Sequence, residues 1–401
     1  MYNCNIPLHD TANEIREEIS RTSGEITDDE ALTMIEKAVF RSETFSMLTF
    51  SEKNEAIKRI FCALRNDLDI LQPYADDDEV SEIMVNGKDV IFIEKRGKIE
   101  KVKDFFEKTE DLEEVIRRIC AKVHREINEL NPIVDARLVD GSRVNAVYKN
   151  IAINGPILTI RKFPKKEITM EMLIKNKTLT DEAAEFLEKL VMAGYNIFVS
   201  GGTSSGKTTF LNVLSDYIPK DERVIVIEDS AELQINEINN IVRMECRNAN
   251  VQERGKVDTK QLIKTSLRMR PDRIIVGEVR GEEVIDMIQA MNTGHDGSLS
   301  TGHGNSIEGM IRRLESMFLQ AADFPIEAIR SQIAEGIDII VHMGRLSDKT
   351  RKVLEIAEIQ GFDGNDVLLN VLFKYNVNTG LERTENELYN REKLELRRLT
   401  I

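Results

Sequence analysis

The stretch NIFVSGGTSSGKTTFLNVL, residues 196–214, decides the fold of this chain. It reads as a buried strand, a glycine-rich loop and a helix that begins at the end of the loop. The loop fits the pattern G-x-x-x-x-G-K-[ST], in which backbone amides and the helix N-terminus surround nucleotide phosphates. The lysine of the pattern, Lys207, reaches the terminal phosphates and is expected to act in catalysis. The residues expected to bind the nucleotide here are Gly201, Gly202, Thr203, Ser204, Ser205, Gly206, Lys207, Thr208 and Thr209.

Outward from this loop, apolar segments recur around Ile197, Val224, Ile274, Leu299 and Ile339, and helical patterns separate them. This alternation predicts an α/β fold with an open, mainly parallel sheet. In such sheets ligands gather outside the carboxyl ends of the strands. The polar residues that directly follow each strand are therefore the candidates for chemistry.

Acidic residues follow two of these strands. Glu228, Asp229 and Glu232 are candidates for binding Mg²⁺ or water, although Asp229 and Glu232 would equally serve as helix caps. Glu278 follows the strand around Ile274 and is the expected catalytic carboxylate, because an ionised group there could orient or deprotonate an attacking water. The structural alternative for Glu278 is an ion pair with Arg280.

Two histidines, His295 and His303, lie eight positions apart in a glycine-rich segment. Two histidines with no nearby cysteine or third ligand make a poor zinc site. An imidazole that faces phosphates can instead respond to the state of the nucleotide, because its charge changes near neutral pH. We expect that role for at least one of the pair.

The first 70 residues read as a small helical region. Thr27 and Glu30 form a capping-box pattern, and apolar residues at helical spacing run from Ile57 to Leu71. An interaction module and a plain packing element predict the same stripe, so the pattern assigns no function to this region.

From about residue 80 the pattern changes to short strands, with a turn at Asn86-Gly87 and a helix near residues 112–123. A polar stretch after Pro164 resembles a linker. The charged segment at the C-terminus reads as a solvated helix. The expected division is a helical region at 1–70, an α+β domain at 71–165, a linker at 166–180, an α/β domain at 181–380 and a charged tail at 381–401.

A hairpin in the α+β domain brings like charges together. With Gly141 in the left-handed position of the loop Val139-Asp140-Gly141, the register places Arg137 opposite Arg143. Directly opposed like charges destabilise a sheet unless something neutralises them, and an anion would do so. The alternative is that both guanidinium groups reach water or pair with Asp135.

Composition restricts the class of protein. The chain has 401 residues with a net charge of −15, which disfavours a surface dedicated to nucleic acid. Its apolar runs are shorter than the roughly 20 residues that span a bilayer, and its first residues lack a signal-peptide pattern. Four scattered cysteines suggest neither zinc nor disulfides, so we expect a cytosolic protein.

Seven segments together resemble the type II/type IV secretion and pilus assembly ATPases, most closely the CpaF-like ATPases of tight-adherence (Flp) pili. The resemblance covers about residues 75–375, and the Flp branch is favoured because no tetracysteine segment is present. The segments are VSEIMVNG (80–87), NPIVDARLVDGSRVNAV (131–147), GPILTIRKF (155–163), GGTSSGKTT (201–209), IEDSAEL (227–233), LRMRPDRIIVGEVRG (267–281) and TGHDGSLSTGHGNS (293–306).

The resemblance implies a RecA-like ATPase domain behind the smaller N-terminal domain, with ATP and Mg²⁺ as cofactors. It implies a cytoplasmic homohexamer at the inner face of the cytoplasmic membrane, with membrane platform proteins as partners. Thr208 and Glu228 would hold Mg²⁺, and Glu228 and Glu278 would act in catalysis. The further nucleotide-binding residues that it implies, with Arg143 and Arg280 added from the arguments above, are Asp229, Glu232, His295, His303, Arg137, Arg143, Arg161, Arg243, Arg247 and Arg280.

Gly277 stands where an ordinary Walker B segment has Asp, which is a trait of this family. Three alternatives to a pilus motor remain open. A conjugative type IV secretion ATPase shares most of the motifs, a RecA-like nucleic-acid motor shares the core fold, and a regulatory or scaffolding protein could bind nucleotide with negligible turnover.

Overall fold

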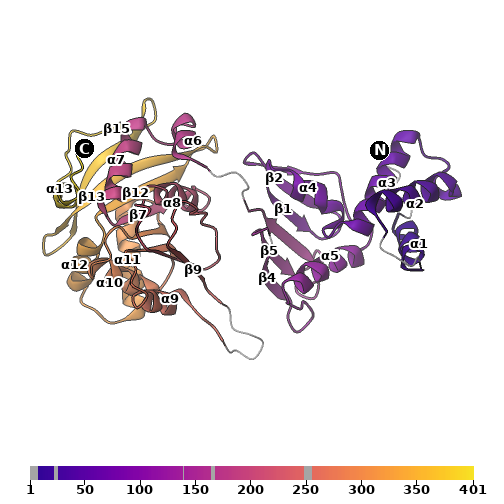
Figure 1. Ribbon diagram of the computed structural model, residues 1–401, viewed down its shortest axis with the longest axis horizontal. Helices are drawn as coiled ribbons and strands as arrows, with labels where there is room; N and C mark the ends of the chain where they lie inside the picture. Colours follow the sequence, from indigo (N-terminus) through magenta and orange to yellow (C-terminus); the bar gives the residue numbers. More distant parts are fainter. Residues whose placement is uncertain (1–7, 22–25, 139, 164–167, 248–254) are drawn as a thin grey trace. The chain divides into compact units, whose positions relative to one another are not determined.

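The computed structural model describes residues 8–21, 26–138, 140–163, 168–247 and 255–401 (Figure 1). The chain divides into two compact units, residues 1–165 and 166–401. Each unit contains a sheet and an apolar core of its own, and the expected α/β class is confirmed. In the described ranges, no helix has both the length and the apolar composition needed to cross a bilayer.

The N-terminal unit begins with a helical region. The capping box of Thr27 and Glu30 is confirmed, and Thr49 forms a second one with Glu52. The apolar stripe does not continue as one helix to Leu71, because the backbone becomes extended at Asn66 and the helix ends there. The elements are α1 (Leu8–Arg21), α2 (Asp28–Arg41), the 3₁₀ turn η1 (Glu43–Phe45) and α3 (Phe50–Arg65).

A six-stranded antiparallel sheet follows, in the order β3-β2-β1-β6-β5-β4. One face buries Val85, Val144 and Leu158 against helix α5, as the alternation of apolar and polar residues requires. The other face carries the polar residues. The elements are η2 (Asp69–Leu71), α4 (Gln72–Asp76), β1 (Val80–Asn86), β2 (Ile91–Lys95), β3 (Lys98–Lys101), α5 (Thr109–Lys122), β4 (Ile133–Arg137), β5 (Arg143–Val147) and β6 (Ile157–Arg161).

The C-terminal unit is built on a nine-stranded sheet in the order β15-β14-β13-β12-β7-β11-β10-β8-β9. Strands from β12 to β9 in this order are parallel, whereas β13, β14 and β15 add antiparallel pairs at one edge. The expected strands are confirmed. The strands are β7 (Ile197–Gly201), β8 (Val224–Glu228), β9 (Ile241–Glu245), β10 (Arg273–Val279), β11 (Leu299–His303), β12 (Ile339–Arg345), β13 (Arg351–Phe362), β14 (Val367–Asn376) and β15 (Gly380–Arg383).

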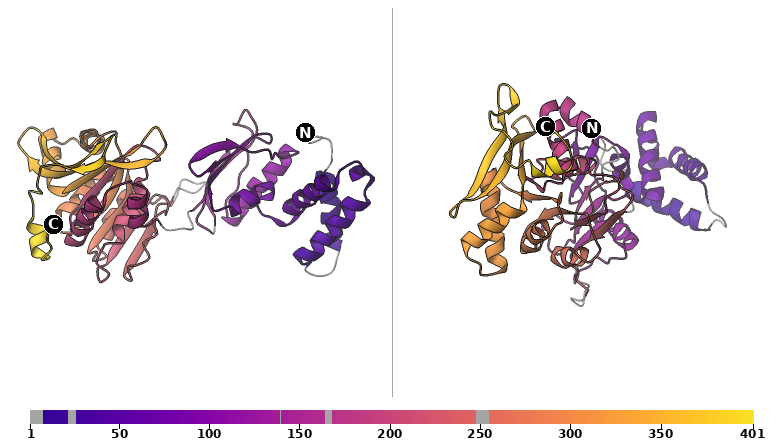
Figure 2. Two further views of the ribbon diagram at one scale, coloured as in Figure 1. Left: turned by 90° about the horizontal axis from the view of Figure 1, so that it is seen from above. Right: turned by 60° about the vertical axis from the view of Figure 1, so that its left-hand side comes forward.

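Helices cover both faces of the parallel part of this sheet (Figure 2). Helices α7 and α8 share one apolar core with the sheet, and α9 to α12 share the other. Burial on both faces explains why β8 is apolar from Val224 to Ile227. The helices are α6 (Met170–Lys175), α7 (Asp181–Ala193), α8 (Lys207–Ser215), α9 (Thr259–Ser266), α10 (Glu283–Asn292), α11 (Ile307–Ala321), α12 (Ile326–Gly336) and α13 (Glu392–Leu396).

Two segments differ from their expected character. Within the expected linker at 166–180, helix α6 buries Met170 and Leu173 in the core of the C-terminal unit. The charged tail contributes buried Leu388 and Leu394, so it is not a freely solvated helix. Apolar residues inside both polar stretches account for the difference, since burial of such side chains stabilises the fold.

Candidate functional site

The glycine-rich loop lies at the carboxyl end of strand β7, before helix α8. Gly206 has a φ of +95°, in the left-handed region that favours glycine. A side chain at Gly201 would come within 2.5 Å of the Met343 carbonyl oxygen on the adjacent strand β12. At Gly202, by contrast, a Cβ would meet no atom within 4 Å. The loop is therefore packed closely at its base and open at Gly202.

Lys207 is 7% exposed, and burial lowers the pKa of its ammonium group. Its Nζ donates to the Gly202 carbonyl oxygen at 3.0 Å and contacts His303 Nδ1 at 3.3 Å. The Oγ of Ser205 is buried and has no hydrogen-bond partner, and Thr208 and Thr209 occupy the first turn of α8. A partly open loop with a buried ammonium and an unpartnered hydroxyl fits phosphate oxygens and a hydrated Mg²⁺.

A line of polar contacts leads from Lys207 to strand β10. His303 Nε2 lies 2.7 Å from Oε1 of Glu278, while Oε2 of Glu278 accepts from the Arg280 guanidinium at 2.8 Å. Burial and the nearby Lys207 charge lower the pKa of His303, which favours the neutral ring. A neutral ring can accept from Lys207 at Nδ1, whereas Nε2 only lies close to Glu278 Oε1, and that buried oxygen has no hydrogen-bond partner. The imidazole therefore lies between the lysine and the carboxylate.

Strand order explains this arrangement. Strand β11, which ends at His303, lies between β7 and β10, and His303 pairs in register with Gly201. Adjacent strands are about 4.8 Å apart, so β10 is roughly 10 Å and β8 roughly 14 Å from the strand that carries the loop. Glu278 thus stands nearer to the phosphate loop than Glu228 does.

Glu228 is 5% exposed and has a clear structural contact. Its Oε1 accepts hydrogen bonds from the backbone amides of Glu232 and Leu233, at 2.8 and 3.0 Å. A Cβ at Gly277 would approach Glu228 Cγ to 3.0 Å, so the glycine leaves room for this carboxylate. Asp229, by contrast, is exposed and accepts from Arg280 at 3.3 Å. The acidic segment therefore orders the loop after β8, and Arg280 joins it to Glu278.

The structure does not bring three of the expected residues to the phosphate loop. His295 precedes β11, at the opposite end of that strand from His303, and its Nδ1 contacts the Ala290 carbonyl oxygen at 3.2 Å. A whole strand therefore separates the two histidines. The role expected for at least one of the pair is open to His303, which lies beside the phosphate loop, and not to His295 within the same chain. The guanidinium of Arg243 donates to Leu233 and Ile235 carbonyl oxygens, and that of Arg247 donates to the Gly255 carbonyl oxygen.

Sequence reasoning did not identify Arg351 as part of the loop's surroundings. Its Nε donates to the Ser204 carbonyl oxygen at 3.0 Å, and its Cδ would lie 3.2 Å from a Cβ at Gly206. Arg351 begins β13, which reaches the loop only because β12 pairs with β7. No local motif around residue 351 signals this contact.

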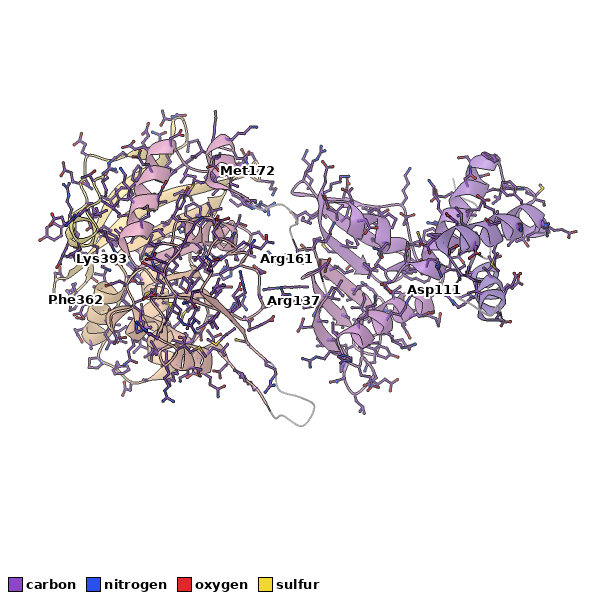
Figure 3. All side chains as sticks on the ribbon, in the orientation of Figure 1. Asp111, Arg137, Arg161, Met172, Phe362 and Lys393 are labelled. Carbon is purple, nitrogen blue, oxygen red and sulfur yellow. The ribbon has the colours of Figure 1, made fainter. Side chains whose placement is uncertain are left out.

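The N-terminal unit contains a row of arginines. The predicted pairing of Arg137 with Arg143 is confirmed, and Arg143 also pairs with Arg161 on β6. Gly141 has a φ of +89°, as expected, whereas Val139 of the same loop lies outside the described residues. Arg137 and Arg161 lie on the face of the sheet turned away from α5 (Figure 3).

The row ends in an acid. Arg161 pairs with Glu82 on β1, so the four residues cross four neighbouring strands on one face. Beside the row, Asn145 donates to Asp135 at 2.9 Å, which shows that Asp135 has an amide partner of its own. Three cationic groups in cross-strand positions make this face suited to an anionic ligand.

Comparison with known proteins gives concordant matches. The family model for Type II/IV secretion system protein matches residues 65–390. An uncharacterized protein of Methanocaldococcus jannaschii is 41% identical over 254 residues, which are 61% of this chain and only 35% of that protein. Conjugal transfer protein TrbB of Rhizobium radiobacter is 32% identical over 294 residues, covering 72% of this chain and 87% of TrbB.

A solved structure agrees in fold. The X-ray structure of the Legionella pneumophila ATPase DotB matches with a TM-score of 0.53 at 21% sequence identity. The match covers 71% of this chain and 78% of the DotB chain.

Proposed function

The chain belongs to the type II/IV secretion system protein family, and from that premise we propose that it is an ATP-hydrolysing motor. The observation that carries the proposal is the contact line from Lys207 through His303 to Glu278 at the carboxyl edge of the sheet. A phosphate-binding lysine connected to a carboxylate is the minimum equipment for positioning water against a terminal phosphate.

In this proposal the loop amides and Lys207 bind the phosphates of ATP. Thr208 would hold Mg²⁺, with Glu228 as the second residue expected to contribute. Bound Mg²⁺ supplies charge neutralisation at the phosphate oxygens. Ser205 provides a further hydroxyl, since it is buried without a partner in the structure.

Glu278 orients the attacking water and accepts its hydrogen bond. The oxygen of that water forms a bond to the terminal phosphorus while the bond between that phosphorus and the ADP oxygen breaks, and the proton of the water passes by way of Glu278 to the released phosphate. His303 and Arg280 keep the Glu278 carboxylate in place from its two oxygens. Phosphate binding would also compete with His303 for Lys207, so this histidine is positioned to respond to the nucleotide.

We further propose that the arginine row of the N-terminal unit binds the anionic nucleotide during the cycle. An ATP-bound and a product-bound state would then differ in affinity for these arginines, and hydrolysis would drive a movement between conformations. Substitutions in this row should therefore affect the movement. The residues concerned are Arg137, Arg143 and Arg161.

The assembly that we propose is a homohexamer in the cytoplasm, held at the inner face of the membrane by platform proteins. Its work would be assembly, with or without retraction, of a Flp or type IV-like pilus, or export of substrates by a type II-like system. The similarity to TrbB, which is named a conjugal transfer protein, favours a second candidate, a motor of a conjugative type IV secretion system.

Phosphate release from Mg²⁺ and ATP by the purified chain tests the central proposal. We expect release that EDTA abolishes, and sedimentation of a hexameric species. Failure to release phosphate, even with membranes of the host containing its platform proteins, would refute the motor. Crosslinking in those membranes separates the two candidates, because a pilus motor captures pilus platform proteins and a conjugative motor captures channel proteins.

A further inference from the structure

A cavity in the N-terminal unit lies between the helical region and the α+β domain, apart from the phosphate loop. The space open to water-sized groups is about 50 Å³, and the empty space is about 580 Å³ when the part open to solvent is included. Helices α1, α3 and α5, the turn η2 and the segment after β3 line it. Since a water needs roughly 10–15 Å³ of the first kind of space, the cavity admits only a few small polar groups.

Asp69 is the most unusual residue of this cavity. It is 8% exposed, and its Oδ1 has no hydrogen-bond partner. Burial raises the pKa of the carboxyl group to about 6, while the nearby Arg118 charge opposes that rise. At neutral pH the group is therefore ionised and short of a donor, a condition that costs stability unless a partner supplies one.

Arg118 faces the same space from helix α5. Its NH1 donates to the Asn66 carbonyl oxygen at 3.2 Å, but its Nε is buried without an acceptor. No hydrogen bond or ion pair within 4 Å joins Arg118 to Asp69, although both are described residues that line the cavity. An anion and a cation thus line the same cavity and attract each other without a hydrogen bond between them.

The other basic groups of the wall already have partners. Arg59 pairs with Asp104 at 2.9 Å and stands 5.4 Å from the ring centre of Phe105. Arg16 donates to the Ala63 carbonyl oxygen at 3.3 Å. The cationic group left with an open donor is therefore Arg118.

Helix α5 lines the cavity with charges of both signs. Asp111 and Glu114 line the wall on the same helical face as Arg118, three and four residues apart, and both raise the pKa of Asp69 through their negative charges. Asp111 is labelled in Figure 3. The wall formed by α5 is therefore acidic at Asp111 and Glu114 and basic one turn further on at Arg118. Ile60 of α3 and Ile70 of η2 provide apolar wall.

We propose that this cavity binds a small zwitterion of the free amino-acid class, with its ammonium on Asp69 and its carboxylate on Arg118. Opposite charges satisfy both buried groups at once, and hydrogen bonds between charged partners are the stronger kind. An apolar side chain would lie along Ile60 and Ile70 toward the mouth. The helical region would then take part in sensing a metabolite, independently of nucleotide binding.

Calorimetric titration of the full chain with individual free amino acids tests this site. We expect saturable one-to-one binding by at least one apolar amino acid, weakened at least about tenfold by N-acetylation or by removal of the carboxylate. Absence of heat with every standard amino acid overturns the proposal. Equal binding of the acetylated or decarboxylated forms, or preference for a neutral ring such as uracil, overturns it as well.

Two variants separate binding from folding. Asp69→Asn should weaken binding at least about tenfold without lowering the melting temperature, because a neutral amide is easier to bury than a carboxylate. The matched control is Asp67→Asn, an exposed carboxylate two residues away that pairs with Lys122, and it should bind as the wild type does. Undiminished binding in Asp69→Asn would overturn the proposal.

Discussion

The two sheets of this molecule arrange their charges in opposite ways. At the carboxyl edge of the C-terminal sheet, a cation, a neutral ring, an anion and a second cation alternate from Lys207 through His303 and Glu278 to Arg280. Each group lies beside a complementary one. These groups are already together in the structure, as preorganised electrostatic catalysis requires, and the buried Oε1 of Glu278 is still without a hydrogen-bond partner.

On the N-terminal sheet, like charges stand side by side instead. Arg137, Arg143 and Arg161 occupy neighbouring cross-strand positions, and Glu82 ends the row with a pKa that burial raises and Arg161 counters. The difference teaches that strand order brings unlike charges together at the edge of one sheet, whereas cross-strand register brings like charges together on the face of the other.

Of the substitutions that test this comparison, removal of Lys207 should have the largest effect on ATP hydrolysis. Lys207→Ala is expected to lower ATP hydrolysis at least about 10³-fold and to weaken nucleotide binding, since the phosphate loses its buried cation. Phosphate release and binding of a fluorescent ATP analogue measure the two effects. Lys220→Ala, which removes an exposed lysine paired with Glu237, is the matched control and should leave both unchanged. Unaltered nucleotide binding in Lys207→Ala would show that the network does not bind the nucleotide phosphates.

The carboxylate should matter almost as much to turnover but little to binding. Glu278→Gln keeps the shape of the side chain and removes its charge, so we expect hydrolysis to fall about 10²- to 10³-fold with nucleotide affinity retained. Glu282→Gln, on an exposed carboxylate paired with Lys260, serves as the control. If Glu228→Gln abolished turnover while Glu278→Gln did not, the catalytic role would pass to strand β8.

Local pattern was sufficient for the elements that depend on neighbours in sequence. The strand, loop and helix around Lys207, the capping box at Thr27 and the hairpin that pairs Arg137 with Arg143 are all confirmed. In each case the deciding interaction joins residues a few positions apart, so spacing alone specifies it.

Local sequence pattern did not predict the contacts that depend on the order of strands in the sheet. His295 and His303 look equivalent in sequence, but strand β11 carries only the second one to the phosphate loop. The buried contacts of Glu228 depend on the space beside Gly277, 49 positions away on the neighbouring strand. Arg351 reaches the loop through the pairing of β12 with β7. These are long-range packing relations, for which no local signal exists.

The arginine row should give an intermediate effect. Arg143→Ala removes the central charge of the row and is expected to lower ATP hydrolysis about tenfold. The difference from the wild type should be smaller at high ionic strength, because salt screens the attraction between the row and the nucleotide. The measurement is turnover at low and high ionic strength. Arg125→Ala, on an exposed arginine of the same unit after helix α5, is the control. Equal turnover in Arg143→Ala and the control would mean that the row serves the N-terminal unit alone.

The smallest effect should come from pH and His303. Burial and Lys207 lower the pKa of this ring below its usual value near 6.5. As pH falls through 6.5, the unfolded chain takes up a proton before the folded chain does, so the stability contributed by His303 is lost toward and below its folded pKa. Protonation also places an N–H of the ring against the Lys207 ammonium, and turnover should decline over the same interval.

In His303→Gln, both the free energy of unfolding and the turnover should fall less steeply as the pH is lowered. The control is His124→Gln, on an exposed histidine of the other unit, which should behave as the wild type does. Parallel pH profiles for His303→Gln and the wild type would mean that the alternating network does not depend on the neutral ring.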